Sequence, residues 1–181
     1  MVGAAIAFTD EQTRIEQHRV DAEMDPLTGL LNRRGLGARW EHSANSAGAV
    51  LAIDLDGFNA INDRYGHDVG DQVLKSAAQR LIASTRGHDI VSREGGDGLI
   101  IIVAGNRRSA EAVAERIVRA FRSDTSVEDI EVPVRASIGG ALISASEPLV
   151  RHGPTSFFTS SSAQARTDGG SGNDGSLFEY F

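Results

Sequence analysis

Two short stretches of this sequence place acids and glycines where a chemical site could form. Asp54 lies near the end of the apolar run 49–56, and Asp97 follows Gly95 and Gly96 in a stretch typical of strand, tight turn, strand. The two glycines permit the positive φ of a tight hairpin and let a bulky ligand approach the backbone. If that hairpin pairs beside the strand that carries Asp54, the two carboxylates converge.

Two converging carboxylates would form a hard-oxygen site. Together with the backbone carbonyl of Leu55, the side chains of Asp54 and Asp97 would suit Mg²⁺, which proteins usually hold jointly with substrate phosphates. A plain Gly-Gly hairpin with a solvated aspartate fits the same residues, and composition alone favours this simpler interpretation. These residues by themselves therefore leave the metal site open.

Composition limits the class of protein. The chain has 181 residues, 40% hydrophobic and 24% charged, which is typical of one globular domain. A net charge of −7 disfavours binding to a nucleic-acid backbone, and the lack of cysteine excludes disulfides and thiolate chemistry. The apolar start is short and has no basic flank, and no run approaches the ~20 residues of a membrane helix. We therefore expect a cytoplasmic protein with no membrane span and no nucleic-acid partner.

Hydrophobic periodicity predicts alternating helices and strands. In "DPLTGLLNRRGL", Asp25 suits a helix cap, Pro26 suits the first helical position and Gly29 breaks the pattern. The order helix, strand, helix, hairpin, helix, strand predicts an α+β sandwich with helices on the sheet. The later elements are expected at a buried strand 49–56, an amphipathic helix 69–84, a hairpin 89–103, a helix 109–121 and a last strand 132–144.

The two ends of the chain carry weaker patterns. Residues 1–24 predict either a connecting helix or a disordered lead. Residues 25–146 predict the folded domain. Residues 147–181 are rich in Ser, Gly and Thr, and we expect a degenerate or poorly ordered C-terminal segment of the same domain.

Four blocks in order give this sequence a specific resemblance to a known family. They are "DPLTGLLNRR" (25–34), "AIDLDGFNAINDRYGHDVGDQVL" (52–74), "RGHDIVSREGGDGL" (86–99) and "VRASIGGA" (134–141). The chain resembles the GGDEF family, the diguanylate cyclases that join two GTP molecules into cyclic di-GMP. The resemblance implies a nucleotidyl-cyclase-like sandwich, with a central, mainly antiparallel sheet flanked by helices.

The resemblance also implies site residues. Asn62 and Asp71 would hydrogen-bond the guanine base of GTP, because amide and carboxylate oxygens can accept from its N–H groups. A helix cap for Asn62 and a solvated first-turn acid for Asp71 are the simpler alternatives. Gly95 and Gly96 would line the same GTP site, while Asp54, Asp97 and the Leu55 carbonyl would hold Mg²⁺.

The sequence departs from the family at positions that carry catalysis. Gly98 stands where the family has its catalytic glutamate, and Leu99 replaces the usual phenylalanine. Asn59 replaces a lysine that in the family contacts phosphate. Arg166 would stand in for the lysine of the later phosphate-binding motif, but the aspartate and tyrosine that normally precede that lysine are absent. We therefore assign no catalytic residue. Phosphoryl transfer relies on positioning and charge stabilisation, so these losses together predict an inactive domain.

One family feature is retained. Arg86 and Asp89 form an Arg-x-x-Asp motif, with five residues between Asp89 and Gly95. In the family this is the inhibitory site for cyclic di-GMP, and Arg116 could assist it from the following helix. Arginine can fork onto guanine O6 and N7, while aspartate can accept from the base N–H edge. The simpler alternative is a surface ion pair of little energetic value.

The sequence supports three functions. The first is a catalytically inactive GGDEF domain that senses cyclic di-GMP or GTP, with a ligand-bridged homodimer and an upstream sensory domain or partner protein as expected partners. The second is an active cyclase in which water or another acid replaces the missing glutamate. The third is a protein-interaction module that binds no nucleotide. The absent side chain at Gly98 disfavours the second, and the retained motifs favour the first over the third.

Overall fold

The computed structural model describes residues 22–43, 48–143 and 177–180. Its elements follow the order expected from the sequence, with four additions. They are α2 (Arg33–Ser43), β1 (Gly48–Leu55), α3 (Phe58–Tyr65), α4 (His67–Ser84), β2 (Ile90–Gly95), β3 (Gly98–Ala104), α5 (Arg107–Ala120), β4 (Thr125–Val127), β5 (Ile130–Val132), β6 (Ala136–Ile143) and β7 (Leu177–Tyr180).

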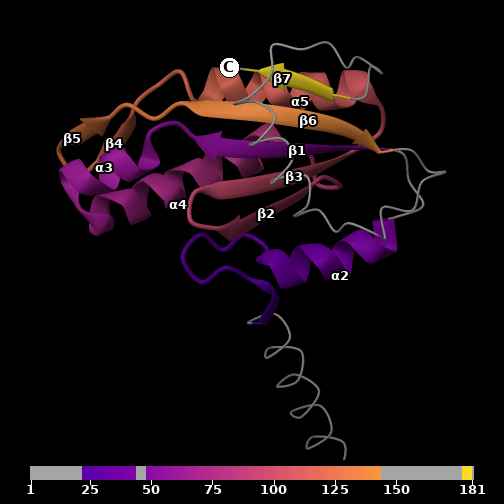
Figure 1. Ribbon diagram of the computed structural model, residues 1–181, viewed down its shortest axis with the longest axis horizontal. Helices are drawn as coiled ribbons and strands as arrows, with labels where there is room; N and C mark the ends of the chain where they lie inside the picture. The colour runs from indigo at the N-terminus through magenta and orange to yellow at the C-terminus, as the bar shows by residue number, and fades with distance from the viewer. Residues whose placement is uncertain (1–21, 44–47, 144–176, 181) are drawn as a thin grey trace, which may run out of the picture.

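A five-stranded sheet forms the centre of the fold (Figure 1). Its order is β2-β3-β1-β6-β7, and every pair of neighbours is antiparallel. The strand β1 lies in the middle and pairs over residues 48–53 with β3 and over its whole length with β6. The predicted α+β class with a mainly antiparallel sheet is therefore confirmed.

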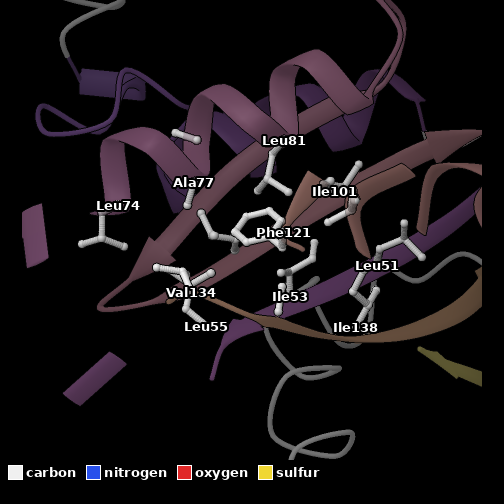
Figure 2. Packing of buried hydrophobic residues seen from close by; sticks show 14 of the residues in the cluster. Leu51, Ile53, Leu55, Leu74, Ala77, Leu81, Ile101, Phe121, Val134 and Ile138 are labelled. Atoms are coloured by element: carbon white, nitrogen blue, oxygen red, sulfur yellow. The ribbon is translucent and has the colours of Figure 1, made fainter. Parts of the chain in front are cut away.

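The main core fills the space between one face of the sheet and helices α4 and α5. Alternate residues of β1 point into it, because side chains in a strand alternate between faces. Figure 2 shows the Phe121 ring between Leu81 of α4 and Ile53 of β1, and all three side chains are at most 1% exposed. This packing fixes the central strand against the two long helices.

A second, smaller core lies on the other face of the sheet, beneath α2. Leu36 of α2 is fully buried there against Val50, Ile100 and Ile102, and Trp40 packs beside them. Val50 alternates with the main-core residues of β1, so the strand is buried on both faces at its start. The sheet is thus held between helices on two sides.

The first helix begins later than the sequence predicted. Asp25 accepts a hydrogen bond from the Thr28 amide at 2.9 Å, but residues 26–28 form a turn and not a helix. The helix α2 starts at Arg33, because the Asn32 side chain accepts from the amides of Arg34 and Gly35. The predicted cap at Asp25 therefore closes a turn.

Four further elements, α3, β4, β5 and β7, were not predicted. The short helix α3 follows β1 directly, and β4 pairs with β5 in a small separate hairpin. The predicted last strand 132–144 is divided: Val132 ends β5, Pro133 has no amide to donate to a ladder, and β6 begins only at Ala136. Residues 177–180, within the segment expected to be poorly ordered, form β7 on the edge of the sheet.

Most of the two predicted terminal segments lies outside the described residues. Within the part of the chain that the structure describes, no helix has the length and apolar character needed to cross a membrane.

Two neighbouring residues of α4 test the core. Leu81 is fully buried and Ile82 is 54% exposed. We expect Leu81→Ala to lower the free energy of unfolding by about 2–5 kcal/mol, because the cavity would open beside Phe121. The control Ile82→Ala removes a similar side chain from the surface and should change it by about 0.5 kcal/mol or less. Urea denaturation measures both, and equal losses would contradict this packing.

Candidate functional site

The turn that joins β2 to β3 has the geometry that its glycines predict. Gly95 and Gly96 adopt φ of 123° and 56°, in the region that favours glycine. Gly96 and Asp97 form the turn itself, and Gly95 pairs with Gly98 across it. The positive-φ prediction for these two glycines is confirmed.

The hairpin β2–β3 lies beside the strand that carries Asp54. The β1–β3 ladder ends with Ile53 opposite Leu99, so Asp54 and Gly98 are the next residues at this end of the two strands, and Asp97 follows in the turn. On the other side of β1, Asp54 pairs with Ser137 of β6. The pairing condition for convergence of the two aspartates is therefore met.

The donor set at this end of the sheet fits a hard cation. Asp54 is exposed and Asp97 is half-buried, and both supply carboxylate oxygen, as the Leu55 backbone supplies a carbonyl. Magnesium takes few protein ligands of this kind and completes its shell with water and phosphate. Among the described residues, no group of three or more His, Cys, Asp or Glu side chains could hold a metal ion.

Glu94 is a further acid of this hairpin that sequence reasoning did not single out. It lies at the irregularity in the β2–β3 register between Arg93 and Gly95. Its side chain is only 8% exposed, and its Oε2 is 3.9 Å from Nε of Arg33 in α2. The carboxylate is therefore drawn into contact with the helix that covers the second core.

Arg93 connects the turn to the N-terminal loop (residues 25–31), a role that no pattern in the sequence predicted. Its Nη1 donates to both carboxylate oxygens of Asp25 at 3.1 Å. Its Nε and Nη2 donate to the Gly96 carbonyl at 3.0 and 2.8 Å. The Arg93 amide also donates to the Leu31 carbonyl at 2.8 Å. Arg93 thus holds the turn and residues 25–31 together through both its side chain and its amide.

These contacts lower the pKa of the Asp25 carboxylate. Burial alone would raise its pKa, but hydrogen bonds from the side chain and amide of Thr28 and from Arg93, with the charge of Arg93, lower the pKa below its ordinary value. The Thr28 hydroxyl donates at 2.6 Å. The folded protein therefore favours the ionised form of Asp25.

The two residues predicted to bind guanine lie on the two helices that meet at the α3–α4 junction. Asn62 lies on α3, and its carbonyl accepts from the Gly66 amide at 2.8 Å where α4 begins. Gly70 is buried on α4, and a Cβ atom there would overlap the Asn62 side-chain oxygen. A glycine is therefore required beside Asn62, and this contact places the Asn62 amide next to the residue that precedes Asp71.

Asn59 and Arg166 stand at the positions where the family has lysines that contact phosphate. Asn59 is exposed on α3, one turn before Asn62. Arg166 lies outside the described residues, so its predicted role stays a prediction.

The third group of predicted residues gathers at the other end of α4. Arg86 is exposed in the loop that follows this helix. Arg116 of α5 donates from Nε to the Ser84 carbonyl at 2.9 Å, two residues before Arg86 in the chain. The two arginines therefore belong to one corner of the molecule, between the end of α4 and the side of α5.

Asp89 lies behind this loop and not on its surface. Its Oδ2 accepts from the Arg86 amide at 2.8 Å, and its Oδ1 accepts from the Ala104 amide at 3.3 Å. Its side chain has 0% exposure. In the folded chain the Asp89 carboxylate is held by these two amides, and its contact with a base stays a prediction.

Comparison with known families now adds to the geometry. The model of the family described as "Diguanylate cyclase, GGDEF domain" matches residues 22–151. The chain is 33% identical over 161 residues to the cyclic di-GMP phosphodiesterase PdeR of Escherichia coli (strain K12), covering 84% of this chain and 24% of PdeR. It is 36% identical to the diguanylate cyclase DosC of the same strain, covering 70% of this chain and 30% of DosC. The chain thus spans less than a third of these relatives' lengths.

Solved structures of GGDEF domains are similar to this chain. A GGDEF domain of PA1120 (TpbB or YfiN) from Pseudomonas aeruginosa matches with a TM-score of 0.65 and 29% identity, over 77% of this chain and 89% of that one. The coiled coil and GGDEF domain of DgcB from Caulobacter crescentus, in complex with c-di-GMP, matches with a TM-score of 0.75 over 90% of this chain and 92% of that one. The latter is 20% identical and supports the fold alone.

The lowered pKa of Asp25 predicts a pH-dependent contribution to stability. A group with a lowered folded pKa stabilises the protein above its ordinary pKa, here 3.8, and loses that contribution as pH falls through the folded pKa. The wild type should therefore exceed Asp25→Asn in free energy of unfolding most at about pH 7, and the difference should shrink toward about pH 3.

Urea denaturation across this pH range measures the difference. Thr28→Val removes the 2.6 Å hydrogen bond but keeps Arg93. The difference in free energy of unfolding between wild type and Thr28→Val should therefore also shrink as the pH falls, but by less than for Asp25→Asn. A difference between wild type and Asp25→Asn that stays constant with pH would contradict the prediction.

Proposed function

Because this chain belongs to the diguanylate cyclase GGDEF domain family, we propose that it is a catalytically inactive member that binds cyclic di-GMP as a regulatory sensor. As a GGDEF domain it has its place in cyclic di-GMP signalling. The corner formed by Arg86 and Arg116 carries the proposal, because Arg116 contacts the end of α4 two residues before the exposed Arg86. Cyclic di-GMP offers both guanine acceptors and phosphate charge to such a corner.

The proposed loss of catalysis rests on the hairpin end of the sheet. Gly98 stands beside Asp54 and has no side chain to accept a proton or bind a second metal. Asn59 brings no charge where the family has a phosphate-binding lysine. Glu94, the acid nearest in sequence to Asp97 of the turn, has a buried side chain 3.9 Å from Arg33 of α2. Because phosphoryl transfer depends on several charged groups acting together, these losses would compound.

GTP is the second proposed ligand. Asp54, Asp97 and the Leu55 carbonyl would hold Mg²⁺, which when bound would neutralise phosphate charge. Asn62 and Asp71 would hold the guanine base, and the close contact between Asn62 and Gly70 supports their arrangement. In this view the site retains base recognition and loses turnover.

The proposal also includes partners of this domain. The chain spans 24% of PdeR and 30% of DosC, so most of the length of those relatives lies outside the match. We propose that it acts in the cytoplasm with an upstream sensory domain or partner protein, and that a stacked ligand bridges two copies of it.

The first test is enzymatic. Purified protein with GTP and Mg²⁺ should form no measurable cyclic di-GMP. Gly98→Glu alone should not restore full turnover because Asn59 still lacks the lysine charge, and Gly98→Glu combined with Asn59→Lys should exceed it. Product formation by chromatography measures this. Steady synthesis by the wild type, abolished by Asp97→Ala, would show that the cyclase is active.

The second test is binding. Arg86→Ala should weaken cyclic di-GMP binding by about tenfold or more, since a forked contact to guanine is worth about 1–3 kcal/mol. Calorimetry compares it with Arg64→Ala, a control at the opposite end of α4, which should bind as the wild type does. Equal affinity of the wild type and Arg86→Ala, or no binding by either, would remove the sensor proposal and favour the protein-interaction module.

A further inference from the structure

We propose that Lys75 reads the O6 atom of guanine in the GTP site and adds a third specificity contact to those of Asn62 and Asp71. The inference rests on the proposed function, because it concerns how the GTP site would recognise its base. Lys75 is the only lysine among the 18 lysine and arginine residues of the chain. It stands at neither position where the family has a phosphate-binding lysine, so its surroundings on α4 decide what it can bind.

Lys75 and Asp71 share one face of α4. They are four residues apart, and side chains at that spacing are neighbours on a helix, with Cβ atoms about 5–6 Å apart. Asp71 is exposed and Lys75 is half-buried, while Leu74 between them is buried in the main core. A base that bonds to the Asp71 carboxylate would thus lie within reach of the flexible four-carbon stem of Lys75.

The Lys75 ammonium is available to a ligand. Arg80, further along α4, donates to the carbonyls of Ser123 and Asp124 at 2.9 Å each, so its guanidinium is committed to the chain that follows α5. Within the described residues, Lys75 has no hydrogen-bond or ion-pair partner. An ammonium has three donors and no acceptor. Lys75 can therefore offer a neighbouring base a donor and nothing else.

Asn62 bounds the same site from α3. Its side-chain oxygen lies against Gly70, the residue before Asp71, where an added Cβ atom would overlap it. Because this oxygen is turned toward the α4 backbone, the amide nitrogen is the group that Asn62 has left for a base. Along α4 the site then presents a donor from Asn62, an acceptor from Asp71 and a donor from Lys75.

This order of groups matches one edge of guanine. From N3 to O6 the base offers an acceptor, then the 2-amino and N1–H donors, then the O6 acceptor. Asp71 would accept from the donors, and Lys75 would donate to O6. Adenine has no N1–H and carries an amino donor in place of O6, so it would leave both side chains without a partner. Lys75 thus separates the two bases at the atom that differs between them.

Calorimetry on the full chain with Mg²⁺ tests the inference by changing one atom of the ligand. In 6-thio-GTP a sulfur replaces O6 and is a weak acceptor, while the N1–H and 2-amino groups remain. The wild type should bind GTP about tenfold more tightly than 6-thio-GTP, because a hydrogen bond from a charged donor is worth about that factor. Lys75→Met keeps a similar stem without the charge and should bring the two affinities within about twofold.

Two further variants control this measurement. Gln79→Met makes a matched change at an exposed position one turn further along α4, and it should bind both ligands as the wild type does. Lys75→Arg restores a charged donor and should keep a preference for GTP.

The ratio of the two affinities decides the outcome. Equal affinity of the wild type for GTP and 6-thio-GTP would overturn the inference. An equal loss of both ligands in Lys75→Met would also overturn it, because it would show a general attraction between the ammonium and the phosphates. Both results would leave the proposed function intact. No binding of GTP by the wild type would overturn the inference together with the proposed GTP site, whereas cyclic di-GMP binding is measured independently.

Discussion

The hydrogen bonds of Arg93 hold the hairpin turn and the N-terminal loop in one arrangement. The guanidinium fills two roles that no other described residue combines: it neutralises the Asp25 carboxylate and it binds the carbonyl of Gly96 inside the turn. A glycine-rich turn has little stiffness of its own, since glycine has many accessible conformations. Fixing the Gly96 carbonyl from outside therefore gives the turn a definite shape, and with it the position of Asp97 beside β1.

The remaining parts of the candidate sites depend on how the helices meet the sheet. The helix α4 connects the predicted guanine-binding residues with the arginine corner of Arg86 and Arg116. Asn62 and Asp71 lie around the start of this helix, and Arg86 follows its end. The same helix packs through Leu81 against Phe121 and the central strand. A rigid core element thus sets the separation between the guanine-binding residues and the arginine corner, although neither place contributes much to the core itself.

The sequence predicted those features that depend on local conformation or on family resemblance. The positive φ of Gly95 and Gly96 follows from the residue type, and the pairing of the hairpin beside β1 follows from the resemblance. The Arg93–Asp25 contact joins residues 68 positions apart, so no local pattern indicates it. The burial of Asp89 was also missed, because the Arg-x-x-Asp spacing does not reveal whether a carboxylate faces solvent or the backbone. The sequence shows Pro133, but the hydrophobic pattern on both sides of it predicted one continuous strand over 132–144, which the structure divides.

The contact between Leu31 and β2 has a consequence for how the chain can be handled. β2 is an edge strand of the sheet, and Leu31 pairs with Ser92 and accepts from the Arg93 amide. Exposed strand edges are templates for pairing with other chains. A fragment that began at Gly48 would keep all five strands but would lose this cover, together with Leu36 over the second core. Such a fragment would expose both a strand edge and an apolar face, and self-association would then limit its solubility.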